Sequence, residues 1–415
     1  MLNLRIGLFL GLRQMQHTNP WTTILIIIVI VFTFLNLVVV SGILSGIVDG
    51  AMKATRSEGL ADIIINPLAG ESAIKESARI FGILDTFSEI QSYSPRYTNL
   101  ATIEANYKER RDLSIDPDII SITMTGINPV KEAETVAIES IISEGEYFKE
   151  GESGYIILGK YAIDRYAVEF GSVFPSLENV YPGDTVRVTA GDRSEEFVVK
   201  GIIDSKIDLI SFSMFMPEKE FRRLFGRDDH NVNQIIVRLK PGEDEDVVKK
   251  ALQMTDIRLF TRVETFTESL PKYILDVSKT FDVLGLFVGV IGIIVASITI
   301  FIIIFINALS RRRQIGILKA IGMSKESIEY AYVIQAGTYT IIGAALGLFL
   351  TYFFLIPYFI ENPIDFPYSY VSLSLTDTDL FLRAGALICV TLIAGFVPAW
   401  LITRQNTLNA VLGRK

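Results

Sequence analysis

The stretch SRRRQIGILKAIGMSKESI (residues 310–328) is a short polar segment between two very apolar ones. The apolar segments are Phe281–Leu309 and Ala331–Ile360. Each is long enough to cross a bilayer, because about 30 Å of hydrocarbon takes about 20 helical residues. The stretch is therefore expected at a membrane surface, where it joins two spans.

The same stretch predicts two helices separated by a break. Apolar residues recur within Gln314–Ile321 at the spacing of one helical face, at Ile315, Leu318 and Ile321. Gly322 is a suitable helix-ending residue, because glycine adopts a left-handed backbone without a Cβ clash. Ser324 can then cap the next helix. The prediction is a short, rigid helix at the membrane surface, with the shape of a docking element.

On charge alone, this stretch could be a basic loop that only fixes topology. The whole string, however, resembles the coupling-helix signature of FtsX-like permeases, the MacB/LolCDE class of ABC transporters. Gln314 departs from that signature, which usually has a glutamate there, and so removes one charge from the expected contact. The resemblance implies that an ATPase subunit is contacted by Arg311, Arg312, Gln314, Ile315, Gly316, Ile317, Leu318, Lys319, Ala320 and Gly322.

Two more apolar runs, Trp21–Val40 and Leu380–Ile402, bring the number of expected spans to four. About 230 residues of ordinary globular composition lie between the first and second spans, enough for one or two domains. We expect an α-helical membrane protein with four transmembrane helices and a large α+β extracytoplasmic domain inserted between helices 1 and 2. The predicted segments are an interfacial helix 1–20, span 21–45, extracytoplasmic domain 46–278, span 279–309, coupling helix 310–328, span 329–360, loop 361–379, span 380–402 and tail 403–415.

Charge predicts the orientation in the membrane. Residues 1–20, the segment 310–330 and the C-terminal tail are all basic, although the chain as a whole has a net charge of −8. Lysine and arginine are enriched in cytoplasmic loops. We therefore expect a multi-pass protein of the cell inner (plasma) membrane with both termini cytoplasmic and an acidic insert outside.

Residues 2–16 predict an amphipathic helix in the cytoplasmic interface, with Leu4, Leu8, Leu12 and Met15 on one stripe. The residue patterns of the insert predict both strands and helices, which alternate along the chain. Strands are expected over Ala61–Asn66, Thr98–Glu104, Ile119–Ile127, Tyr155–Leu158, Thr185–Ala190, Glu196–Ile203, Asn233–Leu239 and Ile257–Thr261. Helices are expected over Ala73–Leu84, Gly159–Phe170, Pro217–Phe225 and Asp244–Met254.

The insert also resembles the periplasmic core domain of the same permeases. The matching pieces are short but keep their order: Gly145–Phe148, Gly159–Ala162, Tyr181–Val186 and Val199–Ile202. The C-terminal end, with Pro398-Ala399 and Asn406–Leu412, fits as well, although the family usually has Asp-Pro near Asn406. The resemblance thus covers nearly the whole chain.

Residues 154–160 spell the first seven places of a phosphate-binding loop, but Tyr161 stands where serine or threonine should ligate magnesium. The intervening residues favour a strand, so we interpret this segment as ordinary strand-then-helix packing. The chain is therefore expected to bind no cofactor, and ATP with Mg²⁺ is expected on a partner ATPase.

The sequence contains no convincing catalytic or metal site. Its two histidines, His17 and His230, are predicted on opposite sides of the membrane, and its one cysteine, Cys389, lies in the fourth span. The acidic residues Asp204, Asp208, Asp228 and Asp229 favour a solvated surface. We therefore expect a non-catalytic transporter subunit rather than a membrane-anchored enzyme.

Three features allow two interpretations each. The small-residue pairs Gly285/Gly289, Gly292/Ala296 and Gly343/Gly347 favour helix packing either within one subunit or between subunits. The apolar run Ile210–Met216 is either a buried strand or a contact for a lipid-bearing client. Asp282 is either a boundary residue or a functional charge near the membrane.

The resemblance implies a permease that passes ATP-driven motion to its outer domain and thereby releases lipoproteins or exports hydrophobic or periplasmic substrates. The alternative is an FtsX-like signalling permease that activates a cell-wall hydrolase and transports nothing. Expected partners are two ATPase copies, a second permease as homodimer or heterodimer, membrane lipid, and a lipoprotein, carrier or adaptor protein. No nucleic acid is expected.

Overall fold

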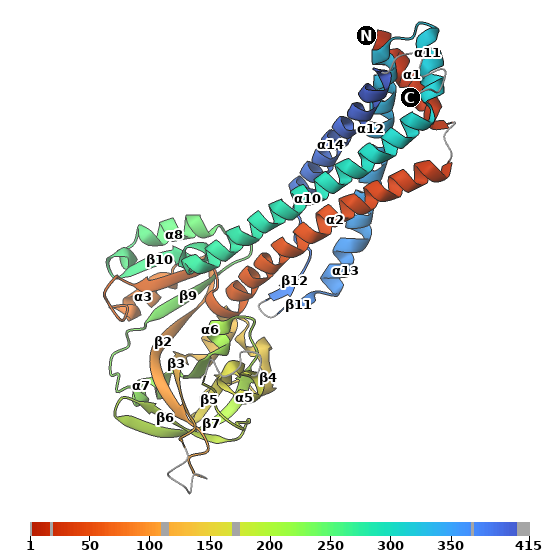
Figure 1. Cartoon of the computed structure of the whole chain (residues 1–415). Helices are drawn as coiled ribbons and strands as arrows, with labels where there is room; N and C mark the ends of the chain where they lie inside the picture. Colours follow the sequence, from red (N-terminus) through yellow and green to blue (C-terminus); the bar gives the residue numbers. More distant parts are fainter. Residues whose placement is uncertain (1, 17–19, 109–115, 168–174, 367–368, 405–415) are drawn as a thin grey trace. The chain divides into compact units, whose positions relative to one another are not determined.

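The computed structural model describes the chain except residues 1, 17–19, 109–115, 168–174, 367–368 and 405–415. The chain divides into two compact units. The membrane unit comprises Met1–Gly50, Asp276–Phe366 and Tyr370–Lys415. The α+β unit comprises Ala51–Leu275 with Pro367–Ser369. Figure 1 shows the elements of both units along the chain.

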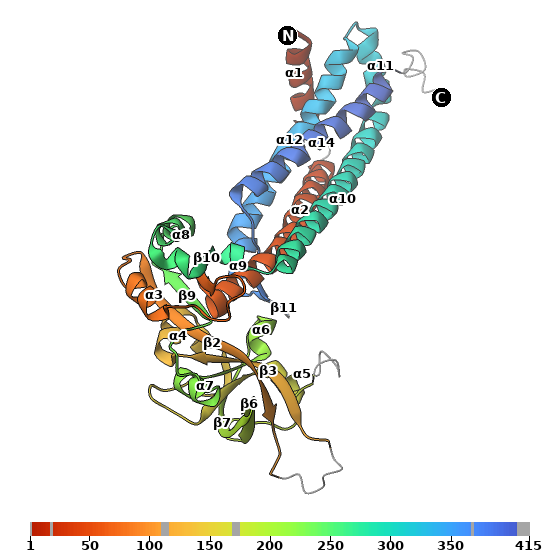
Figure 2. The ribbon, with the colours of Figure 1, turned by 90° about the vertical axis from the view of Figure 1, so that its left-hand side faces the viewer.

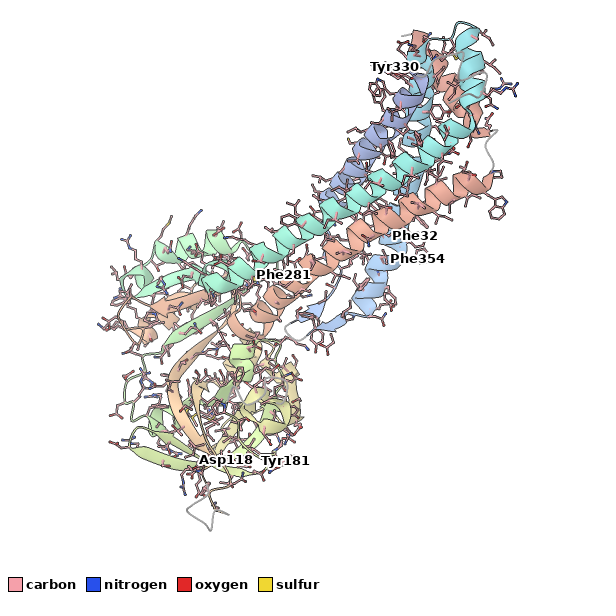
Figure 3. The ribbon with its side chains drawn as sticks, in the orientation of Figure 1. Phe32, Asp118, Tyr181, Phe281, Tyr330 and Phe354 are labelled. Atoms are coloured by element: carbon pink, nitrogen blue, oxygen red, sulfur yellow. The ribbon has the colours of Figure 1, made fainter. Side chains whose placement is uncertain are left out.

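The membrane unit contains four helices that are long and apolar enough to cross a membrane, as predicted. They belong to α2 (Pro20–Ala54), α10 (Lys272–Ser310), α12 (Lys325–Leu350) and α14 (Asp377–Thr403). Large apolar side chains cover their outer surface; Phe32 and Phe354, for example, are 67% and 61% exposed (Figure 3). An apolar exterior of this kind is stable in lipid rather than in water.

Close approach of α2 and α12 depends on two glycines. A Cβ atom on Gly343 would lie 2.6 Å from Ile30 Cγ2, and one on Gly347 would lie 2.5 Å from Phe34 Cδ1. The Gly343/Gly347 pair therefore packs within this subunit, which confirms one of the two interpretations for that pair. Gly289 has no atom within 4 Å of its would-be Cβ, so the role of the Gly285/Gly289 pair stays open.

The N-terminal helix α1 (Leu2–Gln16) packs on α12 through its glycines. A Cβ on Gly7 would lie 2.7 Å from Tyr330 Cβ, and one on Gly11 would lie 2.8 Å from the Ala331 carbonyl oxygen. Two leucines of the predicted stripe face outward, since Leu8 and Leu12 are 50% and 45% exposed, whereas Met15 packs partly against the apolar cluster of the membrane unit. The two exposed leucines agree with the predicted interfacial helix, although its depth in a membrane stays a prediction.

The predicted span 329–360 continues past α12 through a π-helical segment (Thr351–Leu355) and α13 (Ile356–Glu361). The predicted 361–379 loop has more structure than expected, because it contains two short paired strands, β11 (Ile364–Phe366) and β12 (Ser369–Val371). Three-residue strands are too short to give a periodicity signal, which is why the sequence did not predict them.

The α+β unit is built on a ten-stranded mixed sheet with the order β10-β1-β9-β2-β3-β8-β5-β7-β4, while β6 pairs with β2 and β7. Figure 2 shows the long strand β2 beside β3. The strand bounds are β1 Ile63–Pro67, β2 Ile90–Glu104, β3 Ile119–Ile127, β4 Ile142–Gly145, β5 Tyr155–Gly159, β6 Thr185–Ala190, β7 Arg193–Ile203, β8 Ser213–Pro217, β9 Gln234–Leu239 and β10 Thr261–Thr265.

Short helices complete this unit. They are α3 (Ser77–Leu84), α4 (Pro129–Thr135), α5 (Asp164–Ala167), α6 (Asp208–Ser211), α7 (Glu218–Leu224), α8 (Glu245–Gln253) and α9 (Phe266–Ser269). Turns of 3₁₀ helix cover Ile138–Ile141, Lys160–Ala162 and Asp256–Leu259.

The fold confirms most predicted elements of the insert and corrects two. The predicted helix Gly159–Phe170 is wrong, because a 3₁₀ turn and the four-residue α5 stand there, and residues 168–170 lie outside the described residues. The predicted strand Ile257–Thr261 is also wrong; that segment is a 3₁₀ helix that precedes β10. Both segments are too short for periodicity to separate helix from strand.

Consecutive isoleucines in β1 reflect a strand that is buried on both faces. Ile63, Ile64 and Ile65 are all fully buried. Ile63 and Ile65 belong to the main apolar core, whereas Ile64 packs in a smaller cluster with Phe266 and Leu270. Side chains of a strand alternate between its faces, so an unbroken apolar run is stable only where both faces are covered.

The apolar run Ile210–Met216 leads from the end of α6 (Asp208–Ser211) into the buried strand β8 (Ser213–Pro217). All five residues of β8 are buried, and Met214 and Met216 belong to the main core. This confirms the strand interpretation and leaves β8 no surface for a lipid-bearing client.

We predict that the buried ion pair between Arg96 and Glu132 stabilises the packing of α4 against β2. Glu132 is fully buried, and it accepts hydrogen bonds from Ser94 Oγ (2.5 Å) and Arg96 Nε (3.0 Å). Glu132→Ala leaves Arg96 buried without a counter-charge, which should cost about 3–5 kcal/mol. Hydrogen–deuterium exchange of β2 peptides in the detergent-solubilised chain measures this loss as faster exchange.

Glu196→Ala serves as the matched control for this prediction. Its ion pair with Lys108 is solvent-exposed on both sides, so exchange of the same β2 peptides should hardly change. Equal exchange in the wild type and in Glu132→Ala would contradict the stabilising role of the buried pair.

Candidate functional site

The predicted coupling helix is present as α11 (Arg312–Ala320), which begins two residues after α10 ends. The Gly322 N–H donates to the Lys319 carbonyl oxygen at 3.1 Å, and Gly322 has φ +93°, as expected for the residue that ends this helix. Ser324 then caps α12, because its Oγ accepts from the Ser327 N–H at 3.3 Å. The predicted order of helix, break and new helix is confirmed.

One side of α11 is fixed to the membrane unit. Ile315 is 3% exposed and belongs to an apolar cluster with Ala308, Ile328 and Tyr332, while Leu318 packs partly against the same cluster. Gly316 is buried too. This inward side holds the short helix in one orientation relative to the ends of α10 and α12.

Lys319 also points inward. Its Nζ donates to the carbonyl oxygen of Thr403 at 2.8 Å, and the Thr403 hydroxyl donates to Glu329 Oε1 at 2.6 Å. A cation at the last carbonyls of a helix satisfies unpaired acceptors and complements the helix dipole, here at the C-terminal end of α14. Burial, followed by the charge of Lys325, lowers the pKa of Lys319. Lys319 therefore ties α11 to α14.

The opposite side of α11 is exposed and partly apolar. We call this side the docking face; it consists of Arg313, Gln314, Ile317, Ala320 and Ile321, all exposed. Ile317 is 45% exposed and Ile321 is 78% exposed. Ile321 shares the predicted stripe with Ile315 and Leu318 but is exposed, whereas those two residues are buried and half-buried, because Ile321 follows the last residue of α11.

The ten sequence-predicted contact residues thus divide between the two sides of α11. Gln314, Ile317, Ala320 and Gly322 are exposed, whereas Arg311, Ile315, Gly316, Leu318 and Lys319 are buried or half-buried. The side chain of Arg312 lies outside the described residues, as do His17, the side chain of Asp282 and the motif near Asn406. Contact with an ATPase stays a prediction for all ten.

A second candidate site lies in the α+β unit, where the chain leaves the first span and enters the second. The strand β1 follows α2 and its π-helical extension (Thr55–Leu60), and β10 precedes α10 with only the one-turn α9 and a short link between them. The two strands are antiparallel neighbours, with Ile63 opposite Thr265 and Pro67 opposite Thr261. Backbone pairing therefore joins the chain segments that lead to both spans.

Polar side chains reinforce this join. We call Arg56, Asp62, Arg238 and Glu245 the root cluster. Asp62 is 5% exposed and accepts from Arg56 Nε at 2.7 Å, from Arg238 Nη1 at 3.2 Å and from the Leu239 N–H at 2.7 Å. Arg56 also pairs with Glu245. Burial raises the pKa of Glu245, and the charge of Arg56 acts against that rise.

The backbone within the root cluster is strained. Ala61, between the π-helical segment and β1, has φ +58° and ψ −143° and is fully buried. A residue with a Cβ atom rarely adopts this conformation, which typically costs about 1–3 kcal/mol and tends to occur at functional sites. Segments of π-helix also occur frequently at such sites. The end of the first span is therefore held in a fixed but strained conformation.

No pattern in the sequence predicted the root cluster. Its members come from the π-helical segment, the loop before β1, strand β9 and helix α8, and only tertiary structure brings them together. Lone arginines and acids in an acidic domain are usually solvated surface residues.

Residues 154–160 are packed as a strand and the start of a turn. Residues Tyr155–Gly159 are strand β5, Ile156–Leu158 are fully buried, and Lys160 pairs with Asp204. The strand of the predicted strand-then-helix packing is confirmed, whereas a 3₁₀ turn (Lys160–Ala162) follows it in place of the helix. Among the residues that the structure describes, no group of three or more His, Cys, Asp or Glu side chains is arranged to hold a metal ion.

Comparison with known families matches both parts of the chain. The family model described as FtsX-like permease C-terminal matches residues 286–407. The model described as MacB-like periplasmic core domain matches residues 21–255, more than half of the chain.

The curated proteins that this chain resembles also carry the word permease in their names. The macrolide export ATP-binding/permease protein MacB of Burkholderia pseudomallei (strain 1710b) is 27% identical over 227 residues, which are 52% of this chain and 33% of the relative. The protein of that name from Campylobacter jejuni subsp. jejuni serotype O:23/36 (strain 81-176) is 24% identical over 340 residues, 78% of this chain and 51% of the relative. The matched region thus spans between a third and a half of the length of these relatives.

A solved structure, the periplasmic region of MacB from Actinobacillus actinomycetemcomitans, covers 51% of this chain and 92% of its own, with 16% identity and a TM-score of 0.36. The two family models together cover the large domain and the C-terminal spans in the order expected from the sequence. The chain belongs to the family of FtsX-like, MacB-type ABC transporter permeases.

Proposed function

We propose that this chain is the permease subunit of an ABC transporter that is driven by a separate ATPase. Two ATPase copies bind ATP and Mg²⁺ on the cytoplasmic side, and a second permease copy or a related chain completes the assembly. The permease itself catalyses nothing. It converts movement of α11 into movement of the α+β unit, and so drives lipoprotein release or export of hydrophobic or periplasmic substrates.

The observation that carries this proposal is the two-sided character of α11. Ile315 and Lys319 fix the helix to the membrane unit, while Ile317 and Ile321 are exposed. An exposed apolar face on a rigidly held helix is typical of a protein-binding surface. The basic residues around α11 support a cytoplasmic location for this face, where an ATPase would meet it.

An ATPase partner is supported by two observations. The curated relatives carry both ATP-binding and permease in their names. The chain's one phosphate-loop-like segment is a buried strand. Closed two-fold assemblies are the commonest form of soluble oligomers, so two permeases with two ATPases are the simplest stoichiometry.

Transmission follows from the continuity of the chain. The helix α10 runs unbroken for 39 residues, from Lys272 to Ser310, and α11 follows it directly. At its other end the chain passes through α9 into β10, which pairs with β1. A push on α11 therefore acts on a helix whose far end is attached to the sheet. The root cluster holds the segment after the first span to the same sheet.

A second candidate function is signalling of the FtsX type, in which the same movement activates an extracellular cell-wall hydrolase and no substrate is transported. The FtsX-like match to residues 286–407 supports this alternative. The two functions differ in the client of the α+β unit. Reconstitution with the ATPase in vesicles distinguishes them, because only the transporter releases or exports a lipid-modified or hydrophobic substrate.

We predict that acidic substitutions on the docking face abolish ATPase binding. Ile317→Asp with Ile321→Asp places two charges in the proposed apolar contact, so recovery of the ATPase with the tagged permease should fall at least about tenfold, which corresponds to about 1.4 kcal/mol. The control is Leu259→Asp, an equally exposed apolar residue (58%) in the α+β unit. Unchanged recovery in the double variant, inserted at the wild-type level, would refute the assignment of α11.

We also predict that loss of the root cluster uncouples ATPase binding from ATP-dependent substrate release. Asp62→Ala leaves Arg56 and Arg238 without their shared acceptor, and removal of one partner from a buried pair typically costs about 3–5 kcal/mol locally. ATPase binding should persist, whereas ATP-dependent substrate release should fall strongly and exchange of peptides spanning residues 56–66 should accelerate.

Glu104→Ala, which breaks the ion pair with Arg187 elsewhere in the α+β unit, is the matched control for Asp62→Ala. It should leave substrate release at the wild-type level. If Asp62→Ala retains full release although exchange at 56–66 accelerates, the root cluster is only a stabilising feature and does not transmit movement.

A further inference from the structure

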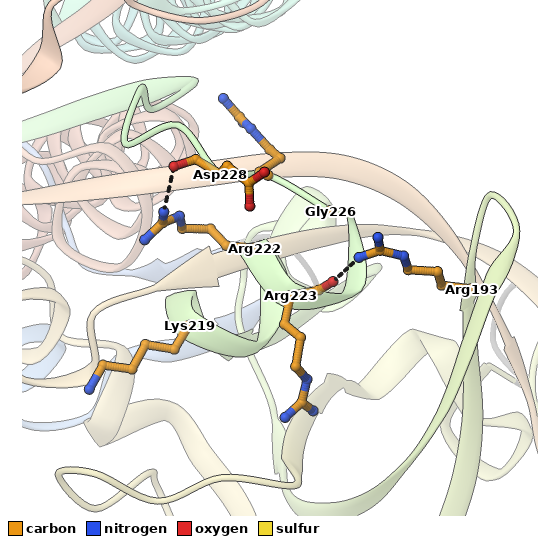
Figure 4. A pocket seen from close by; sticks show the side chains of 7 residues that line it. Arg193, Lys219, Arg222, Arg223, Gly226 and Asp228 are labelled. Carbon is orange, nitrogen blue, oxygen red and sulfur yellow. Dashed lines mark hydrogen bonds between the residues drawn. The ribbon is translucent and has the colours of Figure 1, made fainter.

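One basic recess of the α+β unit does not converge on a ligand. Arg193, Lys219 and Arg222 line it, but Figure 4 shows their charged ends pointing away from one another around α7. Arg193 Nη1 donates to the Arg223 carbonyl oxygen at 2.6 Å, and Arg222 Nε donates to the Asp229 carbonyl oxygen at 3.2 Å. These arginines therefore stabilise the turn that follows α7. Contacts that do converge lie in the membrane unit, on one face of the first span.

This face is formed by small and polar residues of α2, within the stretch SGILSGIVD (residues 41–49). Gly42, Gly46 and Asp49 recur at the spacing of one helical face, and Ser41 lies at its border. Both glycines are buried. Because glycine has no side chain to turn inward, another part of the chain must cover this face.

The covering segment is the link between β12 and α14. A Cβ atom on Gly46 would lie 1.9 Å from the Ser372 carbonyl oxygen, and one on Gly42 would lie 3.0 Å from Leu373 Cγ. The first distance is far inside van der Waals contact, so any other residue at position 46 would displace the link. Glycine is therefore required for this close approach of two backbones.

Hydrogen bonds hold the link and α14 in the same place. The Ser374 N–H donates to the Gly42 carbonyl oxygen at 3.2 Å, and the Ser374 hydroxyl donates to the Asp49 carboxylate. From α14 itself, Arg383 Nη2 donates to Ser41 Oγ at 2.5 Å. We call this set of contacts the clasp; its members are Ser41, Gly42, Gly46, Asp49, Ser372, Leu373, Ser374 and Arg383.

Arg383 is the unusual member of the clasp, because it belongs to the fourth span. Its Nη1 is buried and has no hydrogen-bond partner among the described residues. An ionisable side chain within a span is costly and tends to mark a functional position. Packing of α14 against α2 could be achieved by an apolar residue, so the arginine indicates that the contact with Ser41 has a role beyond packing.

The second span approaches α2 less closely than the clasp does. A Cβ on Gly285 of α10 would lie 3.7 Å from Ser41 Oγ, an ordinary van der Waals distance, and one on Gly289 would have no atom within 4 Å. At Gly343 and Gly347, by contrast, α12 admits no Cβ beside α2. The first span is therefore fixed to α12 and to the segment that leads into α14.

We propose that the clasp gives movement of α11 a second path to the α+β unit, through the first span. Lys319 ties α11 to the end of α14, and the clasp ties the start of α14 and its link to α2. The helix α2 then continues into the π-helical segment that carries Arg56 of the root cluster. The clasp is a joint that stays closed, and its members are positioning residues for the proposed transport function, on which this inference rests.

Cross-linking of the full chain in nanodiscs tests the joint without an ATPase. In a Cys389→Ser background, Asp49→Cys with Ser374→Cys should form a disulfide with copper phenanthroline as oxidant. Adding Gly46→Val should slow cross-linking at least about tenfold, because the new side chain displaces the link. Gly385→Val is the matched control, since a Cβ there has no atom within 4 Å. Equal cross-linking with Gly46→Val would overturn the clasp.

Hydrogen–deuterium exchange of residues 56–66 in the permease–ATPase complex tests the path. ATP should change this exchange in the wild type and in Gly385→Val, whereas Gly46→Val should lose most of the change although the ATPase still binds. The disulfide-closed variant should keep the change. A full ATP-dependent change in Gly46→Val would overturn the proposal, because α10 would then carry the movement alone.

Two further outcomes separate the clasp from the function on which it rests. If the closed disulfide abolishes the ATP-dependent change and reduction restores it, the clasp must open during the cycle, and the proposal of a closed joint is wrong. If ATP changes nothing in the wild type although the ATPase is bound, the proposed function itself fails, and the second path fails with it.

Discussion

The antiparallel pairing of β1 with β10 is the constraint on which the rest of this structure depends. The chain leaves the first span towards β1 and returns to the second span from β10, some 200 residues later, in adjacent strands. Backbone hydrogen bonds between these strands make one mechanical joint of two segments that are distant in sequence. Because β1 is also paired with β9, this joint is part of the ten-stranded sheet, at the edge formed by β10, rather than a flexible linker.

Side chains then make the joint stiff. An apolar cluster packs beside it, formed by Ile64, Phe266 and Leu270. Asp62 accepts hydrogen bonds from Arg56, from Arg238 and from the backbone N–H of Leu239. A buried carboxylate with three donors is stable only while all three remain in place, since each unpaired group would be costly in a low-dielectric interior. The strained Ala61 persists for the same reason: the contacts around it determine its conformation.

The membrane unit achieves rigidity by a different route, because lipid provides no hydrophobic drive between helices. Glycines bring backbones close together there. Gly343 and Gly347 allow α2 to pack closely against α12, and Gly7 and Gly11 allow α1 to pack closely against the same helix. At the cytoplasmic end predicted by the charge pattern, Lys319 joins α11 to α14. A short helix that is attached to α10, α12 and α14 can pass on a displacement instead of absorbing it.

The sequence alone determined the features that depend on local patterns. Long apolar runs predicted four spans, and the order of apolar residues, Gly322 and Ser324 predicted α11, its end and the cap of α12. Most strands of the insert followed from their alternation. The family resemblance rested on the same stretch, so the coupling helix and the domain plan could be predicted together.

Only the tertiary structure decided which side chains meet. It left Ile321 exposed although Ile321 shares one helical stripe with the buried Ile315, and it turned Lys319 inward. It assembled the root cluster from four elements, and it packed the link before α14 against one face of α2. Ion pairs between distant residues leave no periodic pattern in a sequence. Their positions follow from strand order and register, which are set by long-range pairing rather than by local propensity.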